Sequence, residues 1–499
     1  MAMFYLVLVV FSLIFLYFGL KKSYWDKRGV PGPKPWPFIG NIGPHFLGRK
    51  TLGQVFVDIY RKYEGYPFVG TFRAGTPCLL VRDPELVHRI LVKDFKSFRN
   101  NEMYVDKDTD TLFNRNPFAL RDQEWKDTRQ MLTPGFTSGR LKNLFPIMTS
   151  ITKDFIKFIE HHPTANTDGI ETRLLTKRYT LDNVAKAAFG IDGKSFESYE
   201  ELSDFMQLAN SFLTPGTLHG LFMQVIQIFP VLLRIIPPKL ISGDIEKKMI
   251  SIISEVRQHR LQNDAIHKDY LQFLIELGKE NKFSDTEVTA HATTFFFDGY
   301  VTSSLVLSYA LLCLAQNTKY QERVREEILK TEEKNNGEVT YEALQEMELL
   351  HACLWESIRL FPVGDILTKA CTEPFEYTPE DPSFKKITLN VKVGDIVMIP
   401  FSMFSKDPKY FENPEKFYPE RMLGKDGTIN KVFYPFGMGP RACIGQRLGT
   451  MQIKIGLVHV IKNFEVTVSP KLQQPIKYHP FNIMNEIKGG LWLKYKKIK

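Results

Sequence analysis

The feature that most restricts the fold is a long apolar segment that runs from Ser284 to about Gln316. Ser284, with Glu287 three residues later, forms a capping-box pattern, which predicts a helix that starts at this serine. The helix is apolar around most of its circumference, so no face of it suits water. We therefore expect a helix that runs buried through the centre of a large, mainly α-helical domain.

Size and cysteine content fit such a domain. The chain has 499 residues, of which 43% are hydrophobic, and it can bury a large core. Its five cysteines are odd in number and scattered, which argues against a disulfide scaffold, a zinc site or a dithiol site and favours a reducing compartment. The formal net charge of +9 suits nucleic acid, anionic lipid or an acidic protein equally well, because all three respond to the same long-range field.

The N-terminus predicts a membrane anchor. Residues 1–20 carry no charged side chain and, as a helix, are just long enough to cross a bilayer core of about 30 Å. Basic residues follow this stretch and none precedes it, so the positive-inside rule puts the rest of the chain in the cytoplasm. A cleaved secretory signal is the alternative, but its usual basic start and small-residue cleavage site are absent. Residues 21–44 read as a basic, proline-rich hinge in a stiff extended form, and residues 45–499 as the catalytic domain.

Helical patterns dominate from Leu52 onward. Strand candidates occupy residues 67–81 and 386–399, and a β-rich tail runs from Phe464 to Tyr495. The segment 211–241 is strongly apolar, but its prolines interrupt it too often for a second membrane span. Its composition fits contact with a membrane surface or the lining of an apolar entrance channel, and it fits ordinary core packing equally well.

The stretch PFGMGPRACIGQRLG, residues 435–449, places Cys443 in a loop ahead of an apolar helix. Three of its glycines stand at positions 437, 439 and 445. Such glycines let backbone approach a flat ligand and adopt φ angles that other residues avoid. A helix starting near Ile444 would direct its positive end at the sulfur and favour the thiolate, while Arg441 could bind an anion by a bidentate contact. Together these features suggest an anionic cofactor that carries a thiolate-binding metal, although an isolated cysteine is more commonly an ordinary core residue.

The loop satisfies the pattern FxxGxRxCxG and closely resembles the haem-binding loop of cytochrome P450 enzymes, the haem-thiolate monooxygenases. Other marks of the family follow in its order: WxxxR at Trp125 and Arg129, the central helix, ExxR at Glu356 and Arg359, FYPER at residues 417–421 and GGLWL at residues 489–493. The resemblance covers nearly the whole chain and is nearest to insect microsomal members. It implies the cytochrome P450 fold, mainly α with a large helical region, a long central helix and small β-sheets, preceded by a transmembrane helix.

The resemblance implies haem b as the cofactor, with Cys443 as the proximal iron ligand, whose thiolate favours O–O cleavage. The residues that it assigns to cofactor binding are Cys443, Arg441, Phe436, Gly437, Trp125, Arg129 and Lys369. Phe436 would shield the sulfur, and the cationic residues and the tryptophan would hold the propionates. Lys369 stands where many relatives have an arginine; lysine keeps the charge but loses the planar fork.

The oxygen-activating stretch departs from the family pattern. It reads Asp298, Gly299, Tyr300, Val301, Thr302. Thr302 keeps the expected hydroxyl, but Val301 replaces the acid that usually precedes it. Asp298 lies at i−4 from Thr302 and can share its face of the helix. We expect Thr302 and Asp298 to be the catalytic residues, with Asp298 supplying or organising protons; binding a polar substrate atom or capping a local bulge is the alternative for Asp298.

Glu356 and Arg359 lie three residues apart, so they share one helical face. On an exposed helix such a pair contributes only a few tenths of a kcal/mol. Apolar neighbours and the family pattern, which adds an arginine matching Arg421, predict instead a buried network that stabilises the haem side of the fold.

The resemblance implies insertion of one oxygen atom of O₂ into a hydrophobic small molecule, in xenobiotic or endogenous lipophile metabolism. Electrons from NADPH would arrive through NADPH-cytochrome P450 reductase, with cytochrome b5 as a further partner and no role for nucleic acid. The enzyme would sit in the endoplasmic reticulum membrane with its catalytic domain on the cytoplasmic face. Two alternatives remain: a haem-thiolate isomerase or dehydratase that uses no external O₂, which Val301 favours, and a non-enzymatic haem-binding protein. Substrate contacts are expected in residues 102–120, 205–241, 291–302 and 363–368 and in the loop near Phe481.

Overall fold

The computed structural model describes residues 5, 23–213, 239–262, 267–281, 283–424 and 431–498. Apart from Tyr5, the anchor predicted at residues 1–20 lies outside the described residues, as does most of the apolar segment 211–241. Within the described ranges, one helix is long and apolar enough to span a membrane, and most of it is buried inside the protein. The anchor therefore stays a prediction.

The described chain is mainly helical, with small sheets, as the sequence predicts. Its helices are α2 (Gly43–Phe46), α3 (Leu52–Lys62), α4 (Pro84–His88), α5 (Asp122–Leu132), α6 (Ser138–His161), α7 (Thr172–Val184), α8 (Asp204–Leu213), α10 (Gly243–Gln262), α11 (Tyr270–Asn281), α12 (Asp285–Gln316), α13 (Thr318–Lys334), α14 (Tyr341–Glu346), α15 (Glu348–Leu360), α16 (Phe401–Ser405) and α17 (Gln446–Asn463). Its strands are β1 (Phe68–Arg73), β2 (Thr76–Val81), β3 (Asn100–Asn101), β4 (Ile170–Glu171), β5 (Ile366–Ala370), β6 (Phe375–Tyr377), β7 (Leu389–Val391), β8 (Ile396–Pro400), β9 (Phe464–Val468) and β10 (Trp492–Lys497).

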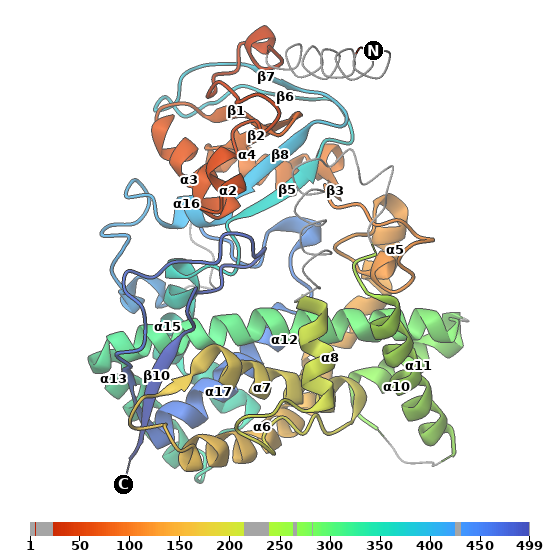
Figure 1. The fold of residues 1–499 in the computed structure, drawn as a ribbon, viewed down its shortest axis with the longest axis vertical. Coiled ribbons are helices and arrows are strands. Elements are labelled where there is room, and N and C mark those ends of the chain that lie inside the picture. Colours follow the sequence, from red (N-terminus) through yellow and green to blue (C-terminus); the bar gives the residue numbers. More distant parts are fainter. Residues whose placement is uncertain are drawn as a thin grey trace.

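The strands form a five-stranded sheet in the order β1-β2-β8-β5-β3, a three-stranded sheet β4-β10-β9 and a pair β6-β7. The two strand regions predicted from the sequence meet in the largest sheet, where β2 pairs with β8 in parallel and Cys78 lies opposite Ile396. The predicted β-rich tail supplies β9 and β10, which pair antiparallel. Figure 1 shows the five-stranded sheet at one end of the molecule and the helical region around α12 at the other.

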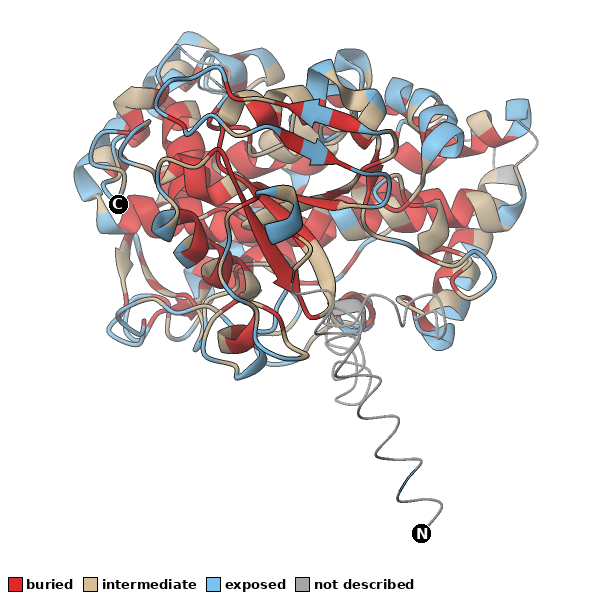
Figure 2. Cartoon of the chain, turned by 90° about the horizontal axis from the view of Figure 1, so that it is seen from above, coloured by how far each residue is buried: buried red, intermediate tan, exposed pale blue. Residues whose placement is uncertain are grey.

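Helix α12 begins as predicted, because the Ser284 side chain accepts from the Glu287 N–H and the Glu287 side chain accepts from the Ser284 N–H. It packs against α7, α15 and α17. The residues from Tyr300 to Ala315 are buried apart from Thr302. Figure 2 shows this buried interior surrounded by exposed surface helices and loops. The expectation of a core helix is confirmed, and the residues that break its apolar pattern, Asp298 and Thr302, lie within it.

The proline-rich hinge differs from the free-standing linker that its composition suggested. Trp25 is buried, and its indole N–H donates to the carbonyl of Thr71 at 2.9 Å. The Gly70 N–H donates to the carbonyl of Pro31 at 2.8 Å. Prolines leave their carbonyls free as acceptors, so the extended segment binds along β1 instead of standing away from it. The expectation of an extended form is also wrong at the end of the segment, where α2 carries Pro44 in its first turn.

Candidate functional site

The cysteine loop takes its shape from two glycines in the left-handed region. Gly437 has a φ of 76° and Gly439 a φ of 70°. A Cβ on Gly439 would lie 2.0 Å from the carbonyl oxygen of Leu91, so only glycine allows this backbone approach. Gly445 does not behave as expected, because its φ is −88° and it serves as the N-cap of α17. The Cys443 N–H donates to the Phe436 carbonyl at 2.8 Å and closes the loop.

The Cys443 side chain is exposed, although enough protein atoms surround the sulfur to desolvate it. Burial raises the pKa of the Cys443 thiol, while the N–H groups of Gly445 and Gln446 lower it. The helix end thus acts in the predicted direction, but α17 starts at Gln446 rather than near Ile444, and desolvation outweighs it. The helix end therefore favours the thiolate, as expected, but a nearby positive charge or metal is needed to overcome the desolvation.

Arg441 is held by the chain itself. Its guanidinium donates to the carbonyls of Arg99 at 2.6 Å, Leu120 at 2.9 Å and Pro117 at 3.0 Å, and it lies 4.1 Å from the ring centroid of Trp125. Burial lowers the pKa of Arg441 to about 9. Most of its donors are therefore used by backbone, and this side chain fastens the cysteine loop to the segments around α5.

Arg129 and Trp125, one turn apart on α5, have free donors. Within the described residues, no acceptor bonds the Arg129 guanidinium or the Trp125 indole N–H. Burial lowers the pKa of Arg129, and the charge of Cys443 raises it. Unused donors of this kind, partly buried beside a cysteine, fit an anionic ligand.

Lys369 on β5 is fully buried, and its Nζ donates to Asn101 Oδ1 at 3.1 Å. Burial, followed by repulsion from Arg441, lowers the pKa of Lys369 to about 7. An anion placed beside Lys369 and Arg441 would stabilise both charges. Lys369, Arg441 and Trp125 therefore lie in one cluster: Arg441 contacts Trp125 directly. Phe95 links Lys369 to Trp125, because its ring lies 5.5 Å from the Trp125 ring and 5.8 Å from Lys369 Nζ.

On α12, Asp298 has an accessible side chain even though the helix is buried. Its carboxylate accepts from Asn116 Nδ2 at 3.2 Å. Burial raises the pKa of Asp298 to about 6, while the hydrogen bond from Asn116 lowers it. The charge of Asp298 in turn raises the pKa of Cys443. The two side chains are therefore close enough for their charges to interact.

Thr302 shares the helix face of Asp298, as the i−4 spacing predicts. Its hydroxyl donates to the backbone carbonyl of Asp298 at 2.8 Å, not to the carboxylate. Val301 is buried. The acid that is missing at position 301 is therefore not replaced by any direct contact between the Thr302 and Asp298 side chains.

A small pocket lies beside this part of α12. Its lining residues are Leu112, Phe113, Asn116, Ile241, Thr293, Thr294 and Phe297. They come from three of the segments in which substrate contacts are expected. The lining is largely apolar, but the cavity volume of about 10 Å³ leaves room for no more than one water molecule.

The predicted ExxR network is buried as expected. Arg359 donates to both carboxylate oxygens of Glu356, each at 2.8 Å, and both side chains are inaccessible to solvent. Arg421 adds a third contact to Glu356 at 3.0 Å. Arg359 also bonds the carbonyls of Ser405 and Pro414. The network ties α15 to the segment before the cysteine loop and touches none of the cofactor-loop residues, so it stabilises structure.

A family model described as Cytochrome P450 matches residues 30–493. The chain belongs to this family. Probable cytochrome P450 28a5 of Drosophila melanogaster is 33% identical over 514 residues, covering 99% of this chain and 100% of the relative. Cytochrome P450 9e2 of Blattella germanica is 31% identical, with 94% of this chain and 93% of the relative covered. Cytochrome P450 6a2 of Drosophila melanogaster is 30% identical, with 99% of each covered. These comparisons confirm the predicted resemblance to insect cytochrome P450 enzymes and the monooxygenase class.

A cytochrome P450 carries haem, and the residues of this chain fit that group. The cysteine sulfur is accessible, two positive-φ glycines flatten the loop beside it, and Arg129 and Trp125 keep donors without protein acceptors. In a cytochrome P450 the haem iron takes a cysteine thiolate as its ligand, and its two propionates need cationic partners. The donor set supplies both kinds of contact.

Sequence reasoning missed three residues of this cytochrome P450. Asn116, Arg173 and Glu486 all bond charged or polar groups at α12 or beside it. Asn116 falls in a segment expected to contact substrate, but no local pattern marks it. Arg173 and Glu486 lie 313 residues apart, so only the folded chain brings them together.

Proposed function

We propose that this cytochrome P450 inserts one atom of O₂ into a hydrophobic small molecule. Electrons would come from NADPH through NADPH-cytochrome P450 reductase, with cytochrome b5 as an auxiliary donor. The observation that carries the proposal is the accessible Cys443 sulfur, which lies close enough to Asp298 and to Arg129 of α5 for their charges to interact. A lipophilic substrate is supported only by the apolar side chains of Leu112, Phe113 and Phe297, which lie together beside this part of α12.

Haem b, held through Cys443, would supply the oxygen chemistry that no side chain provides. The chain's own part is to hold and orient that group. Arg129 and the Trp125 indole would donate to propionate oxygens, and Lys369 and Arg441 would add positive charge behind them. Phe436 would fix the loop through its carbonyl, which accepts from the Cys443 N–H at 2.8 Å, and the positive φ of Gly437 would set the turn of the loop beside the ring.

Thr302 and Asp298 would manage protons on the α12 side. A carboxyl with a pKa of about 6 exchanges protons readily near neutral pH. Asp298 lies one turn from Thr302, and a water molecule between the carboxyl and the Thr302 hydroxyl would complete a path that the missing acid at position 301 would otherwise provide. The competing role for Asp298 is to bind a polar atom of the substrate.

The site of action we propose is the endoplasmic reticulum membrane, with residues 1–20 as the anchor and the catalytic domain on the cytoplasmic face. A cytoplasmic domain with a formal net charge of +9 would also suit an acidic reductase surface. Both xenobiotic and endogenous lipophiles fit the proposal.

Expression of the full chain with haem tests the proposal. The wild type should bind haem, give the reduced carbon monoxide spectrum of thiolate ligation, and consume NADPH and O₂ when a flavoprotein reductase and a lipophile are added. Cys443→Ala should lose the thiolate spectrum, whereas Cys371→Ala, which changes a buried cysteine, should keep it. Wild-type protein without a haem spectrum would overturn the proposal, and turnover of a peroxide or an oxime without NADPH would favour the isomerase or dehydratase alternative.

A further inference from the structure

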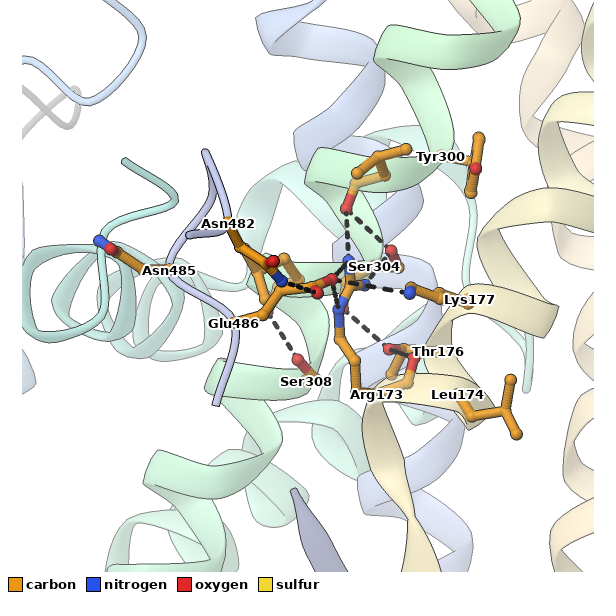
Figure 3. A network of polar contacts seen from close by, with 12 residues as sticks. Arg173, Leu174, Thr176, Lys177, Tyr300, Ser304, Ser308, Asn482, Asn485 and Glu486 are labelled. Carbon is orange, nitrogen blue, oxygen red and sulfur yellow. Dashed lines mark hydrogen bonds and ion pairs between the residues drawn. The ribbon is translucent and has the colours of Figure 1, made fainter. Parts of the chain in front are cut away.

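A cluster of three charged residues joins α7, α12 and the C-terminal loop Tyr478–Ile487. Arg173 of α7 donates to Glu486 Oε1 from Nη2 at 3.0 Å and from Nε at 3.2 Å. Lys177 Nζ lies 3.6 Å from the same oxygen. Figure 3 shows these side chains converging beside α12. The side chains of Arg173, Lys177 and Glu486 are 11%, 18% and 25% exposed, so the charges are well shielded from water.

On one side the cluster holds the turn of α12 that carries Thr302. Arg173 donates to the Ser304 hydroxyl and to the Val301 carbonyl, the latter at 3.4 Å. Two further α7 side chains bond the same turn: the Thr176 hydroxyl donates to the Ser304 carbonyl at 2.8 Å, and the Thr180 hydroxyl donates to the Tyr300 carbonyl at 3.0 Å. The backbone of the oxygen-activating stretch is therefore fixed largely from α7.

On the other side the cluster holds the loop. Tyr478 and Ile487 pair as an isolated bridge at its base, and Asn482 Nδ2 donates to Glu486 Oε2 at 2.9 Å. The tip of the loop is apolar: Phe481 packs on His45 with ring centroids 5.6 Å apart, and Ile483 is 80% exposed. The loop thus reaches from α12 to the N-terminal part of the domain.

The charges depend on one another. Burial opposes the ionisation of Glu486, but the charges of Arg173 and Lys177 outweigh it and lower the pKa of Glu486. Burial, together with the charge of Arg173, lowers the pKa of Lys177. If Glu486 lost its charge, the Arg173 guanidinium would stay shielded with only the oxygens of α12 as acceptors, and its position against Val301 and Ser304 would no longer be fixed.

We propose that Arg173 and Glu486 form an ionic clasp that sets the position of the Thr302 turn and of the apolar loop tip together. Glu486 is then a positioning residue: it acts on Thr302 through Arg173 and on bulky ligands through Phe481 and Ile483. The inference rests on the proposed function, because it assumes that the loop tip borders the substrate space. It goes beyond that function by coupling two parts of the site that lie far apart in the sequence.

The first test follows amide hydrogen exchange in the haem-loaded full chain. Glu486→Gln keeps the size of the side chain and removes the charge, and Glu486→Asp keeps the charge as a rescue variant. We expect Glu486→Gln to speed exchange by about tenfold in both residues 298–304 and residues 478–487, and Glu486→Asp to restore much of the protection. Asn482→Ala, which removes one hydrogen bond to the same carboxylate, serves as the matched control and should affect only residues 478–487. If Glu486→Gln speeds exchange in residues 478–487 but not in residues 298–304, the proposed coupling between the two segments is wrong.

The second test compares the binding of two spectral probes that differ in size. Imidazole is small and reports on the haem iron, whereas a bulky triaryl-substituted imidazole also contacts the surrounding loops. Glu486→Gln should weaken the affinity for the bulky probe by about tenfold and change the affinity for imidazole by no more than about twofold. The proposal would be overturned if the variant bound both probes equally more weakly, or if it bound both as tightly as the wild type. If neither probe shifts the wild-type spectrum, the proposed function has failed instead, and the exchange comparison still decides whether the clasp couples the two segments.

Discussion

Gly437 and Gly439 both adopt positive φ in the cysteine loop, but their surroundings differ. A Cβ at position 437 would meet its nearest atom at 3.6 Å, an ordinary contact, whereas one at position 439 would lie 2.0 Å from the Leu91 carbonyl oxygen. Position 437 needs only the left-handed conformation, which costs an alanine about 1–2 kcal/mol. Position 439 also needs the space that a Cβ would occupy to stay empty.

Alanine at these two positions should therefore give different results. Gly439→Ala forces the backbone of Leu91 or of the loop to move, so we expect it to abolish the thiolate-type carbon monoxide spectrum. Gly437→Ala should keep the spectrum and lower the unfolding free energy by about 1–2 kcal/mol. The measurement is haem content and the reduced carbon monoxide spectrum per mole of protein. Equal retention of haem by both variants would show that the loop does not depend on this close approach.

Asp298 provides a test of the proton path at the same scale. Because the pKa of Asp298 is about 6, the protonated carboxyl becomes scarce as the pH rises through 6. If Asp298 donates protons, wild-type protein should release more peroxide per NADPH as the pH rises from about 5.5 to 7.5. Asp298→Asn should release several-fold more peroxide at the lower pH, with little further change. Unchanged coupling in the variant would leave substrate binding as the role of Asp298.

At the scale of elements, the ExxR network decides how α15 meets the segment that leads into the cysteine loop. Among the described residues, Glu356 is the only carboxylate that forms an ion pair with both Arg359 and Arg421. Removing it would leave both guanidinium groups without their shared partner, one of them fully buried. Breaking a buried pair in this way costs about 3–5 kcal/mol.

Glu356→Gln is therefore expected to lower the unfolding free energy by about 3–5 kcal/mol and to reduce haem retention. Denaturant unfolding and the yield of the carbon monoxide spectrum would measure the two effects. Glu346→Gln is the matched control, because it breaks an ion pair with Lys334 in which both side chains are largely exposed, and it should leave both measurements unchanged. A Glu356→Gln variant as stable as wild type would contradict a structural role for the network.

At the scale of the whole molecule, the catalytic body starts earlier than residue 45. Trp25 packs against the five-stranded sheet: a Cβ on Gly70 would lie 2.3 Å from its ring. Ile42 is buried as well. The described residues between the predicted anchor and α2 therefore pack onto the domain that follows and contribute to its stability.

Two truncations should separate anchor from body. A chain that begins at Ser23 should keep its thermal midpoint and haem content but no longer sediment with membranes. A chain that begins at Asn41 should lose stability, because the pocket around Trp25 and the edge of β1 would be open to water. Trp25→Ala in the full chain should lower stability by about 3–5 kcal/mol and serves as the point-mutation control. Normal stability of the Asn41 chain would contradict this assignment.

The sequence by itself determined the features that depend on neighbouring residues. The capping box predicted the start of α12, and the i, i+3 spacing predicted the Glu356–Arg359 pair. The loop glycines predicted unusual φ angles, which Gly437 and Gly439 adopt and Gly445 does not. Local patterns of this kind report backbone preferences and helical faces, which act over a few residues. They also carried the family motif, and with it the haem-thiolate chemistry.

Only the tertiary structure decided which distant groups share an environment. Asn116 meets Asp298 across 182 residues and Arg173 meets Glu486 across 313, and no periodicity encodes either pair. The same holds for Arg441, whose acceptors are backbone carbonyls from another segment, and for Cys443, whose pKa burial raises against the pull of the helix end. Desolvation and long-range pairing depend on what surrounds a side chain after folding, so they could not be derived from the order of the residues alone.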